Sequence, residues 1–128
     1  MVVYPAIQNE GEIIAKFNNF LTLDVVETTN RFARMDGIGT TCVVEIKTRT
    51  NKYDQYPTTI LPRDKVEHWR NNHPDKDFYC IFRFTDGDYY YKWEEDDPNV
   101  VADGGRTDRE KIEIKPYCYI PINQLTKF

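Results

Sequence analysis

The stretch MDGIGTTCVVEIKTR, residues 35–49, decides the fold that we expect around it. Residues 40–49 are mostly β-branched or apolar, which predicts a strand. Side chains alternate between the two faces of a strand, so Glu45 and Lys47 share one face and their neighbours suit a core. Asp36 lies nine residues before Glu45, and the glycines between them predict a turn in which glycine supplies a positive φ. A hairpin at this turn would bring the Asp36 carboxylate back toward Glu45.

Two converging carboxylates would form a site for a hard divalent cation. Mg²⁺ takes oxygen ligands at about 2.0–2.1 Å and keeps positions for water and a substrate phosphate. Asp36 and Glu45 are therefore candidate ligands of Mg²⁺ (or Mn²⁺), which can polarise a phosphoryl oxygen and lower the pKa of a bound water. The charge of Lys47 can orient that water or offset charge that builds on the phosphate. The alternative for an isolated Glu-x-Lys is an ordinary salt pair between strands.

An amphipathic helix is expected before this stretch, over residues 8–21, with Asn9 as a candidate N-cap. Its apolar side chains at helical spacing are Ile13, Ile14, Phe17, Phe20 and Leu21. Residues 22–35 contain several β-formers and predict a strand. The candidate site strand would therefore follow one helix and one strand.

After the site strand, a polar segment leads to a second helix with Pro62 at its first position, stopped by residues 71–74. Residues 77–93 alternate in character around an Asp-Gly turn, which is typical of a hairpin. Residues 94–111 read as an acidic surface loop, and 112–122 as a last strand. The order predicts an α+β fold with a mixed β-sheet, as a single domain over residues 1–128.

The charge is unevenly distributed along the chain. The net charge of −4 argues against a surface covered with phosphate-binding lysines. Residues 47–70, however, carry six Lys and Arg against three acids, whereas residues 94–113 carry eight acids against three bases. A basic segment directly after the site strand could receive a phosphate backbone, or could merely solvate a surface. The candidate nucleic-acid-binding residues are Arg49, Lys52, Gln55, Tyr56, Arg63 and Lys65.

The stretch MDGIGTTCVVEIKTR resembles the D…(E/D)xK signature of the PD-(D/E)XK nuclease superfamily. VEIKTRTNKYDQY followed by ILPRDKVEHW is similar to small viral or phage members of this group. The resemblance covers roughly residues 10–84 and implies a restriction-endonuclease-like αβββαβ core, to which the last strands add a C-terminal β extension. It also implies that Asp36 and Glu45 bind the metal ion, that Lys47 is the catalytic lysine, and that the first helix adds a glutamate.

The first helix offers two glutamates for that role. Glu10 lies four residues before Ile14 and projects from the apolar face, whereas Glu12 falls about 200° away on the solvent side. A carboxylate on a buried face is costly unless it is paired or bound to metal. Glu10 is therefore the candidate third acidic group, for metal binding and catalysis. The alternative is that residue 10 lies in the first turn, where an acid complements the helix dipole.

Two further features have structural interpretations. A second Glu-x-Lys, Glu113 and Lys115, follows the acidic loop, and Pro116 is expected to end strand pairing directly after it. We interpret this pair as structural. Three widely spaced cysteines lie in apolar or aromatic stretches and are expected as buried thiols, which points to a reducing compartment. They are Cys42, Cys80 and Cys118.

The favoured function is a metal-dependent endo- or exonuclease that hydrolyses phosphodiester bonds of DNA. It would act in the cytoplasm (of the host cell for a viral protein), with a homodimer as an analogy to small nucleases. No apolar run approaches the roughly 18 residues that cross a bilayer, so no membrane partner is expected. A second hypothesis is a non-catalytic interaction protein on the same scaffold, whose acidic segment 94–113 inhibits a partner or mimics nucleic acid. A third is a small β-rich structural protein. Metal binding separates the first two.

Overall fold

The chain forms an α+β structure in a computed structural model that describes residues 10–30, 33–99, 103–106 and 113–128, except the side chains of 103–106 and 113–115. The elements are α2 (Glu10–Leu21), β1 (Val26–Glu27), β2 (Gly37–Ile38), β3 (Cys42–Thr48), β4 (Thr58–Pro62), α3 (Arg63–Asn72), β5 (Asp77–Phe84), β6 (Gly87–Lys92), β7 (Asp103–Arg106), β8 (Glu113–Pro121), the 3-10 helix η1 (Ile122–Gln124) and β9 (Thr126–Lys127). The order α2-β1-β2-β3-α3-β5 confirms the expected αβββαβ core, with β4 placed directly before α3.

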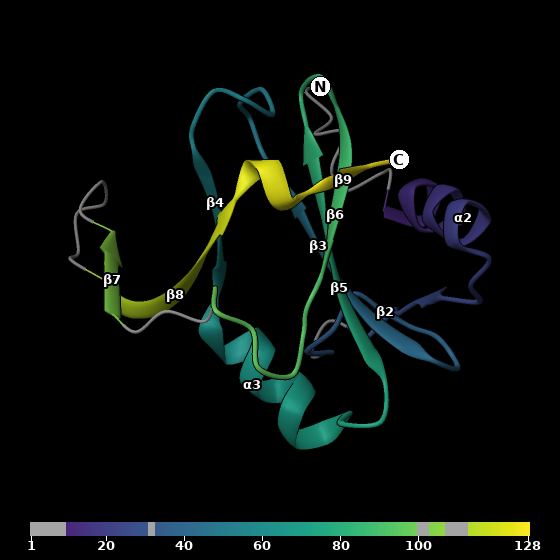
Figure 1. Cartoon of the computed structure of the whole chain (residues 1–128). Coiled ribbons are helices and arrows are strands. Elements are labelled where there is room, and N and C mark those ends of the chain that lie inside the picture. Colours follow the sequence, from purple (N-terminus) through teal and green to yellow (C-terminus); the bar gives the residue numbers. More distant parts are fainter. Residues whose placement is uncertain (1–9, 31–32, 100–102, 107–112) are drawn as a thin grey trace.

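The larger sheet is mixed, with the strand order β1-β2-β3-β5-β6-β9. Strands β3 and β5 are parallel, with Glu45 beside Cys80, and the other neighbouring pairs are antiparallel. Because parallel strands cannot be joined by a tight turn, the chain crosses between them through β4 and α3 (Figure 1). The expected hairpin of β5 and β6 is confirmed, with Phe84 opposite Gly87.

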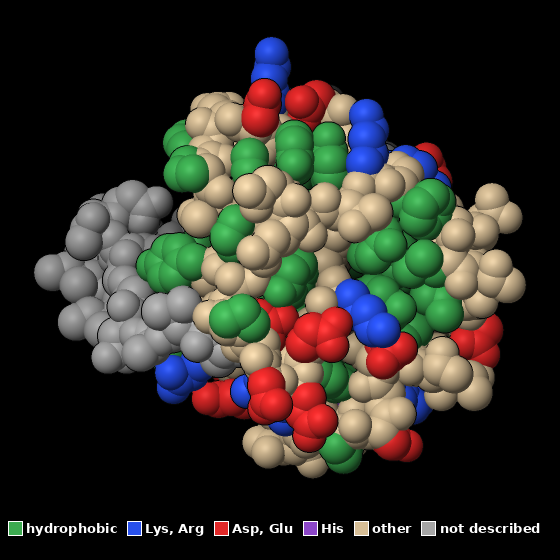
Figure 2. Space-filling model, viewed as in Figure 1, with side chains coloured by type: hydrophobic (Ala, Val, Ile, Leu, Met, Phe, Trp, Pro, Cys, Tyr) green, Lys and Arg blue, Asp and Glu red, His purple; other side chains and the backbone are tan. Residues whose placement is uncertain are grey.

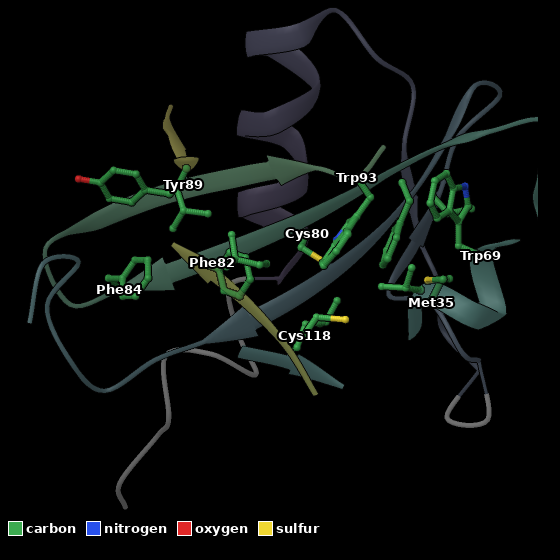
Figure 3. Packing of buried hydrophobic residues seen from close by; sticks show 14 residues of the cluster. Met35, Trp69, Cys80, Phe82, Phe84, Tyr89, Trp93 and Cys118 are labelled. Atoms are coloured by element: carbon green, nitrogen blue, oxygen red, sulfur yellow. The ribbon is translucent and has the colours of Figure 1, made fainter. Parts of the chain in front are cut away.

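The alternation expected for β3 divides the core into two layers. Cys42, Val44 and Ile46 belong to a buried cluster on the α2 side of the sheet. Val43 belongs to the other cluster, which includes Val66 of α3 and side chains from β4 and β8. In Figure 3, sheet residues such as Cys80 and Phe82 and the β8 residue Cys118 are directed into this second layer. Glu45 alternates with Val44 and therefore enters the layer on the α3 side.

Helix α2 is held on the opposite face by aromatic packing. The Phe17 ring meets the Tyr79 ring edge-on at 5.2 Å and the Tyr90 ring at 5.4 Å. At the end of the helix, the Asn18 side chain bonds both the N–H and the C=O of Val25. Phe20, expected in the core, is 52% exposed because it lies at the margin of this aromatic group. The prediction for Phe20 was wrong, but the helix is amphipathic as expected.

A second, three-stranded sheet has the order β4-β8-β7 and packs over α3 (Figure 1). Neither β4, inside the expected polar segment, nor β7, inside the expected acidic loop, was predicted. Pro116 does not end the pairing of β8. It lies opposite Asp103 of β7, and the next residue, Tyr117, lies opposite Pro62 of β4. Pro116 therefore marks the point at which β8 changes partners.

The strand expected over residues 22–35 is reduced to β1. Thr28 continues the register of β1 with β2 by one further step, since its N–H donates to the C=O of Asp36. The Thr28 hydroxyl donates to the C=O of Met35. The second helix begins one residue after the predicted position, with Pro62 as its N-cap, and ends at Asn72 as expected. The candidate cap Asn9 lies outside the described residues.

The acidic segment after β6 packs partly on the protein itself. Asp97 is 6% exposed, accepts the Tyr91 hydroxyl at 2.7 Å and accepts the N–H groups of residues 94 and 99. Arg70 of α3 donates to the C=O of Glu95. In the view of Figure 2, acidic side chains gather on the lower part of the molecule. The three cysteines are buried thiols, as predicted. Among the described residues, no helix has the length and apolarity needed to span a bilayer.

Candidate active site

Asp36 is fixed against the residues on either side of Glu45. Its N–H donates to the C=O of Val44 at 3.0 Å, and its Oδ2 accepts the N–H of Ile46 at 2.7 Å. The C=O of Asp36 accepts the N–H of Thr28 at 2.9 Å. Both backbone groups and one carboxylate oxygen are therefore bonded. The hairpin of β2 and β3 thus brings the Asp36 carboxylate to Glu45 and holds it there.

Gly37 allows this hairpin to be tight, but not for the reason that the sequence indicated. Neither Gly37 nor Gly39 adopts a positive φ, so that expectation was wrong. A Cβ on Gly37 would lie 2.6 Å from Val25 Cγ1 and 2.7 Å from Val44 Cγ2. Only a residue without a side chain fits between these two valines. The glycine is required by close packing beneath the Asp36 backbone.

Glu45 is a buried acid, with 4% of its surface exposed. Burial raises its pKa to about 8, and a hydrogen bond with Asp36 and the charge of Asp36 act in the same direction. The Lys65 ammonium opposes this rise in pKa, since its Nζ lies 2.9 Å from Glu45 Oε2. Oε2 is buried and accepts no hydrogen bond within the described part of the chain. A buried carboxylate oxygen without a hydrogen bond is rare and costly, which makes it a suitable ligand atom for a cation.

Lys47 lies two residues beyond Glu45 on the same face of β3, opposite Phe82 of β5. Lys47 is half-buried. Its charge lowers the pKa of the buried Cys80 thiol, whereas the charge of Glu45 raises it. Burial raises the pKa of Cys80, and Lys47 partly counteracts this effect. The strand therefore brings a cation and the Glu45 carboxylate into one partly enclosed region.

Glu10 lies in the first turn of α2, near enough to Asp36 for the two charges to interact. Burial raises its pKa, followed by repulsion from Asp36 and from Glu27 of β1. Glu12 is exposed and Glu10 is partly buried, as their positions on the helix predicted. Glu27 was not singled out in the sequence, because its place opposite Gly37 depends on the short pairing of β1 with β2. Within the described residues, no three His, Cys, Asp or Glu side chains are grouped closely enough to hold a metal ion.

The chemistry of Asp36 and Glu45 fits a hard divalent cation. Both are oxygen ligands, and they lie within hydrogen-bonding reach of each other. Glu45 supplies a buried Oε2 that faces the Lys65 ammonium without an aligned hydrogen bond in the described part of the chain. A divalent ion would relieve the repulsion between the two carboxylates. The charge of Asp36 acts on Glu10 of α2, and Lys47 follows Glu45 two residues further along β3.

The six candidate nucleic-acid-binding residues divide into two groups. Arg49 donates to the C=O of Ile60 at 2.5 Å and lies over the Phe82 ring, so it ties β4 to the sheet. Arg63 pairs with Glu67, and Lys65 with Glu45. The exposed members are Lys52, Gln55 and Tyr56. The local excess of basic residues is therefore partly neutralised inside the protein.

Comparison with known proteins gives one match. A family profile described as "Phage putative PDDEXK endonuclease" matches residues 13–128. Neither the curated proteins nor the solved structures contain a match. The matched range includes Asp36, Glu45 and Lys47, the residues of the signature on which the resemblance rests. With nearly the whole chain matched, and the expected αβββαβ order present, the chain belongs to this phage family of PD-(D/E)XK endonucleases.

Proposed function

We propose that the chain is a divalent-metal-dependent nuclease that hydrolyses phosphodiester bonds of DNA, with Mg²⁺ (or Mn²⁺) as its cofactor. The observation that carries the proposal is the Asp36–Glu45 pair, in which the buried Oε2 of Glu45 has the Lys65 ammonium at 2.9 Å but no aligned hydrogen-bond donor among the described residues. Nucleases of the PD-(D/E)XK type generally use divalent metal ions, which agrees with this donor set. When bound, the ion would polarise the scissile phosphate and lower the pKa of an attacking water.

The remaining chemistry belongs to the protein's own side chains. Asp36 and Glu45 would hold the ion, and Glu10 would add a negative charge from the α2 side. The hydrogen bonds of Asp36 keep its carboxylate in place, so little reorganisation is needed before reaction. Lys47 would orient the attacking water or offset charge that develops on the phosphate. The mostly buried walls around Glu45 lower the local dielectric and strengthen each of these interactions.

Contacts to the nucleic acid would come first from Lys52, Gln55 and Tyr56, which are exposed beside the site strand. A basic side chain can neutralise a phosphate, and an exposed tyrosine can stack on a base. Arg49, Arg63 and Lys65 could contribute only by exchanging their present partners. One site cuts one strand at a time, so simultaneous cleavage of both strands of a duplex would need a second copy. For a double-strand cut we therefore propose a homodimer.

The non-catalytic alternative gains less support. Within the described part of the segment 94–113, Asp97 is bonded inside the protein and Arg70 binds the backbone at Glu95. These contacts fix the segment on its own α3, although Glu94, Glu95 and Asp96 stay exposed. The three buried thiols are compatible with action in the reducing cytoplasm, in this case of a phage-infected host.

The proposal is tested by nicking of supercoiled plasmid DNA with Mg²⁺ or with EDTA. The protein should nick the plasmid only with Mg²⁺, and Asp36→Asn and Glu45→Gln should each lower the rate by orders of magnitude. Lys47→Met should lower turnover while metal affinity stays the same or rises. Glu10→Gln should slow nicking more than its matched control Glu12→Gln does. Both acids lie on α2, and of the two only Glu10 is partly buried. Equal nicking by the wild type, Asp36→Asn and Glu45→Gln would overturn the proposal.

A further inference from the structure

Lys65, in the first turn of α3, joins the two segments that carry the candidate metal ligands. Its Nζ lies 2.9 Å from Glu45 Oε2 on β3 and donates to the C=O of Arg34 at 2.8 Å, two residues before Asp36. Arg34 also forms an ion pair with Asp64 of the same helical turn, at 3.6 Å. One ammonium group therefore links α3, the site strand and the chain that leads to Asp36.

Lys65 is less accessible to a phosphate than an exposed lysine would be. The Lys65 side chain is only 20% exposed, and the Glu45 side chain that it meets is 5% exposed. The pair is close in distance but lacks the alignment of a hydrogen bond, since Oε2 accepts none within the described residues. Lys47, the lysine of the signature, has no ion pair within 4 Å in the described residues. Of these two lysines, Lys65 is the one in contact with the buried charge.

We propose that Lys65 is a resident counter-cation of the Asp36–Glu45 pair. In the metal-free protein its ammonium stabilises the two carboxylates when both are ionised. It yields Glu45 Oε2 to a divalent ion, while it keeps its bond to the Arg34 carbonyl. The inference rests on the proposed function, because it concerns the same two carboxylates. In this role Lys65 is a positioning residue that sets how strongly the site takes up metal.

Electrostatics gives the expected direction. Removing Lys65 leaves the charge of Glu45, the more buried partner of the pair, uncompensated, which is strongly destabilising. In the metal-bound protein the same lysine would instead face a divalent cation at short range, where like charges repel. Lys65 should therefore stabilise the metal-free protein more than the metal-bound protein. By thermodynamic linkage, its removal should tighten metal binding.

The test is the melting temperature of the full chain in EDTA and in saturating Mg²⁺, at pH about 9, above the pKa of about 8 that burial gives Glu45. Lys65→Met should lower the melting temperature in EDTA by roughly 5–10 °C. Mg²⁺ should then reduce the gap from the wild type by at least half. The matched control is Arg63→Met, which removes the same charge from the same helical turn but breaks only the exposed pair with Glu67. Its gap from the wild type should be small and independent of Mg²⁺.

A second variant keeps the test decisive if Lys65→Met does not fold. Glu45→Gln combined with Lys65→Met removes both charges, so it should fold and be more stable in EDTA than Lys65→Met alone. A double variant no more stable than Lys65→Met overturns the inference. A Mg²⁺ shift in the wild type with an unchanged gap for Lys65→Met also overturns it and leaves the metal site standing. No Mg²⁺ shift in the wild type overturns the metal site, and this inference with it.

Discussion

Replacing Glu45 with glutamine should stabilise the metal-free protein while it abolishes cleavage. Burial, reinforced by Asp36, raises the pKa of Glu45 from its ordinary 4.5 to about 8. Because the pKa is higher in the folded than in the unfolded state, folding takes up a proton at neutral pH. The metal-free wild type therefore loses stability as the pH rises from about 4.5 to about 8, and a glutamine, which does not ionise, avoids this loss.

The size of the effect follows from the same pKa. Each tenfold change in acidity corresponds to about 1.4 kcal/mol, so the full effect above pH 8 is about 5 kcal/mol. About 3 kcal/mol of it is expressed at pH 7, where the unfolded wild type is ionised and the folded protein is mostly protonated. We expect Glu45→Gln to exceed the wild type in the free energy of unfolding by this amount at pH 7 in EDTA. At pH 4 the two proteins should be nearly equal.

Urea denaturation, followed by the fluorescence of the buried Trp69 and Trp93, measures this difference at pH 4, 7 and 8.5. Glu67→Gln is the matched control, since Glu67 is an exposed glutamate paired with Arg63 on α3. Its effect on stability should be small at all three pH values. The reasoning is refuted if Glu45→Gln is less stable than the wild type at pH 8.5 in EDTA. It is also refuted if the difference between the two proteins does not change with pH.

Three further changes test other parts of the structure. Asp36→Asn keeps an acceptor for the N–H of Ile46, whereas Asp36→Ala loses it, so only the alanine variant should lower the free energy of unfolding in urea, by about 1–3 kcal/mol. Gly37→Ala should cost about 1–3 kcal/mol in the same assay, because its Cβ would overlap two valine side chains, and an unchanged stability would contradict the packing argument. Burial tends to raise the pKa of Asp88, but hydrogen bonds from Arg83 and Lys16 hold it below its ordinary value. A carboxyl with a lowered pKa in the folded state stabilises the fold at pH values above its unfolded pKa, and this stabilisation is lost as the pH falls through the folded pKa. Asp88→Asn should therefore reduce the drop in melting temperature between pH 5 and pH 2.

The centre of the site could be predicted because its spacing is local. Alternation along one strand placed Glu45 and Lys47 on the same face. Asp36 lies nine residues before Glu45, and a hairpin this short brings Asp36 back beside β3. The glycines of that hairpin were identified correctly as a requirement, but for the wrong reason. Close packing between two valines is a tertiary property and leaves no mark in a local turn pattern.

Features that depend on distant pairing could not be predicted in this way. Lys65 was grouped with phosphate-binding residues, because its contact with Glu45 requires the crossover that carries α3 back over β3. Arg49 was grouped there too, yet it bonds β4, a strand that forms only because β8 pairs with it from sixty residues away. Local sequence identified the basic charge of both side chains, but their partners are set by the sheet topology.

Crystals soaked in Mn²⁺ would show whether Asp36 and Glu45 bind a metal ion, since the anomalous signal of this ion locates it without ambiguity. We expect a peak between the carboxylates of Asp36 and Glu45, at about 2.0–2.3 Å from at least one oxygen of each. Lys65 Nζ should then lie farther from Glu45 Oε2 than the 2.9 Å of the metal-free protein, which completes the assignment of the metal site. A peak only elsewhere on the protein, or no peak at Mn²⁺ concentrations that support cleavage, would contradict it.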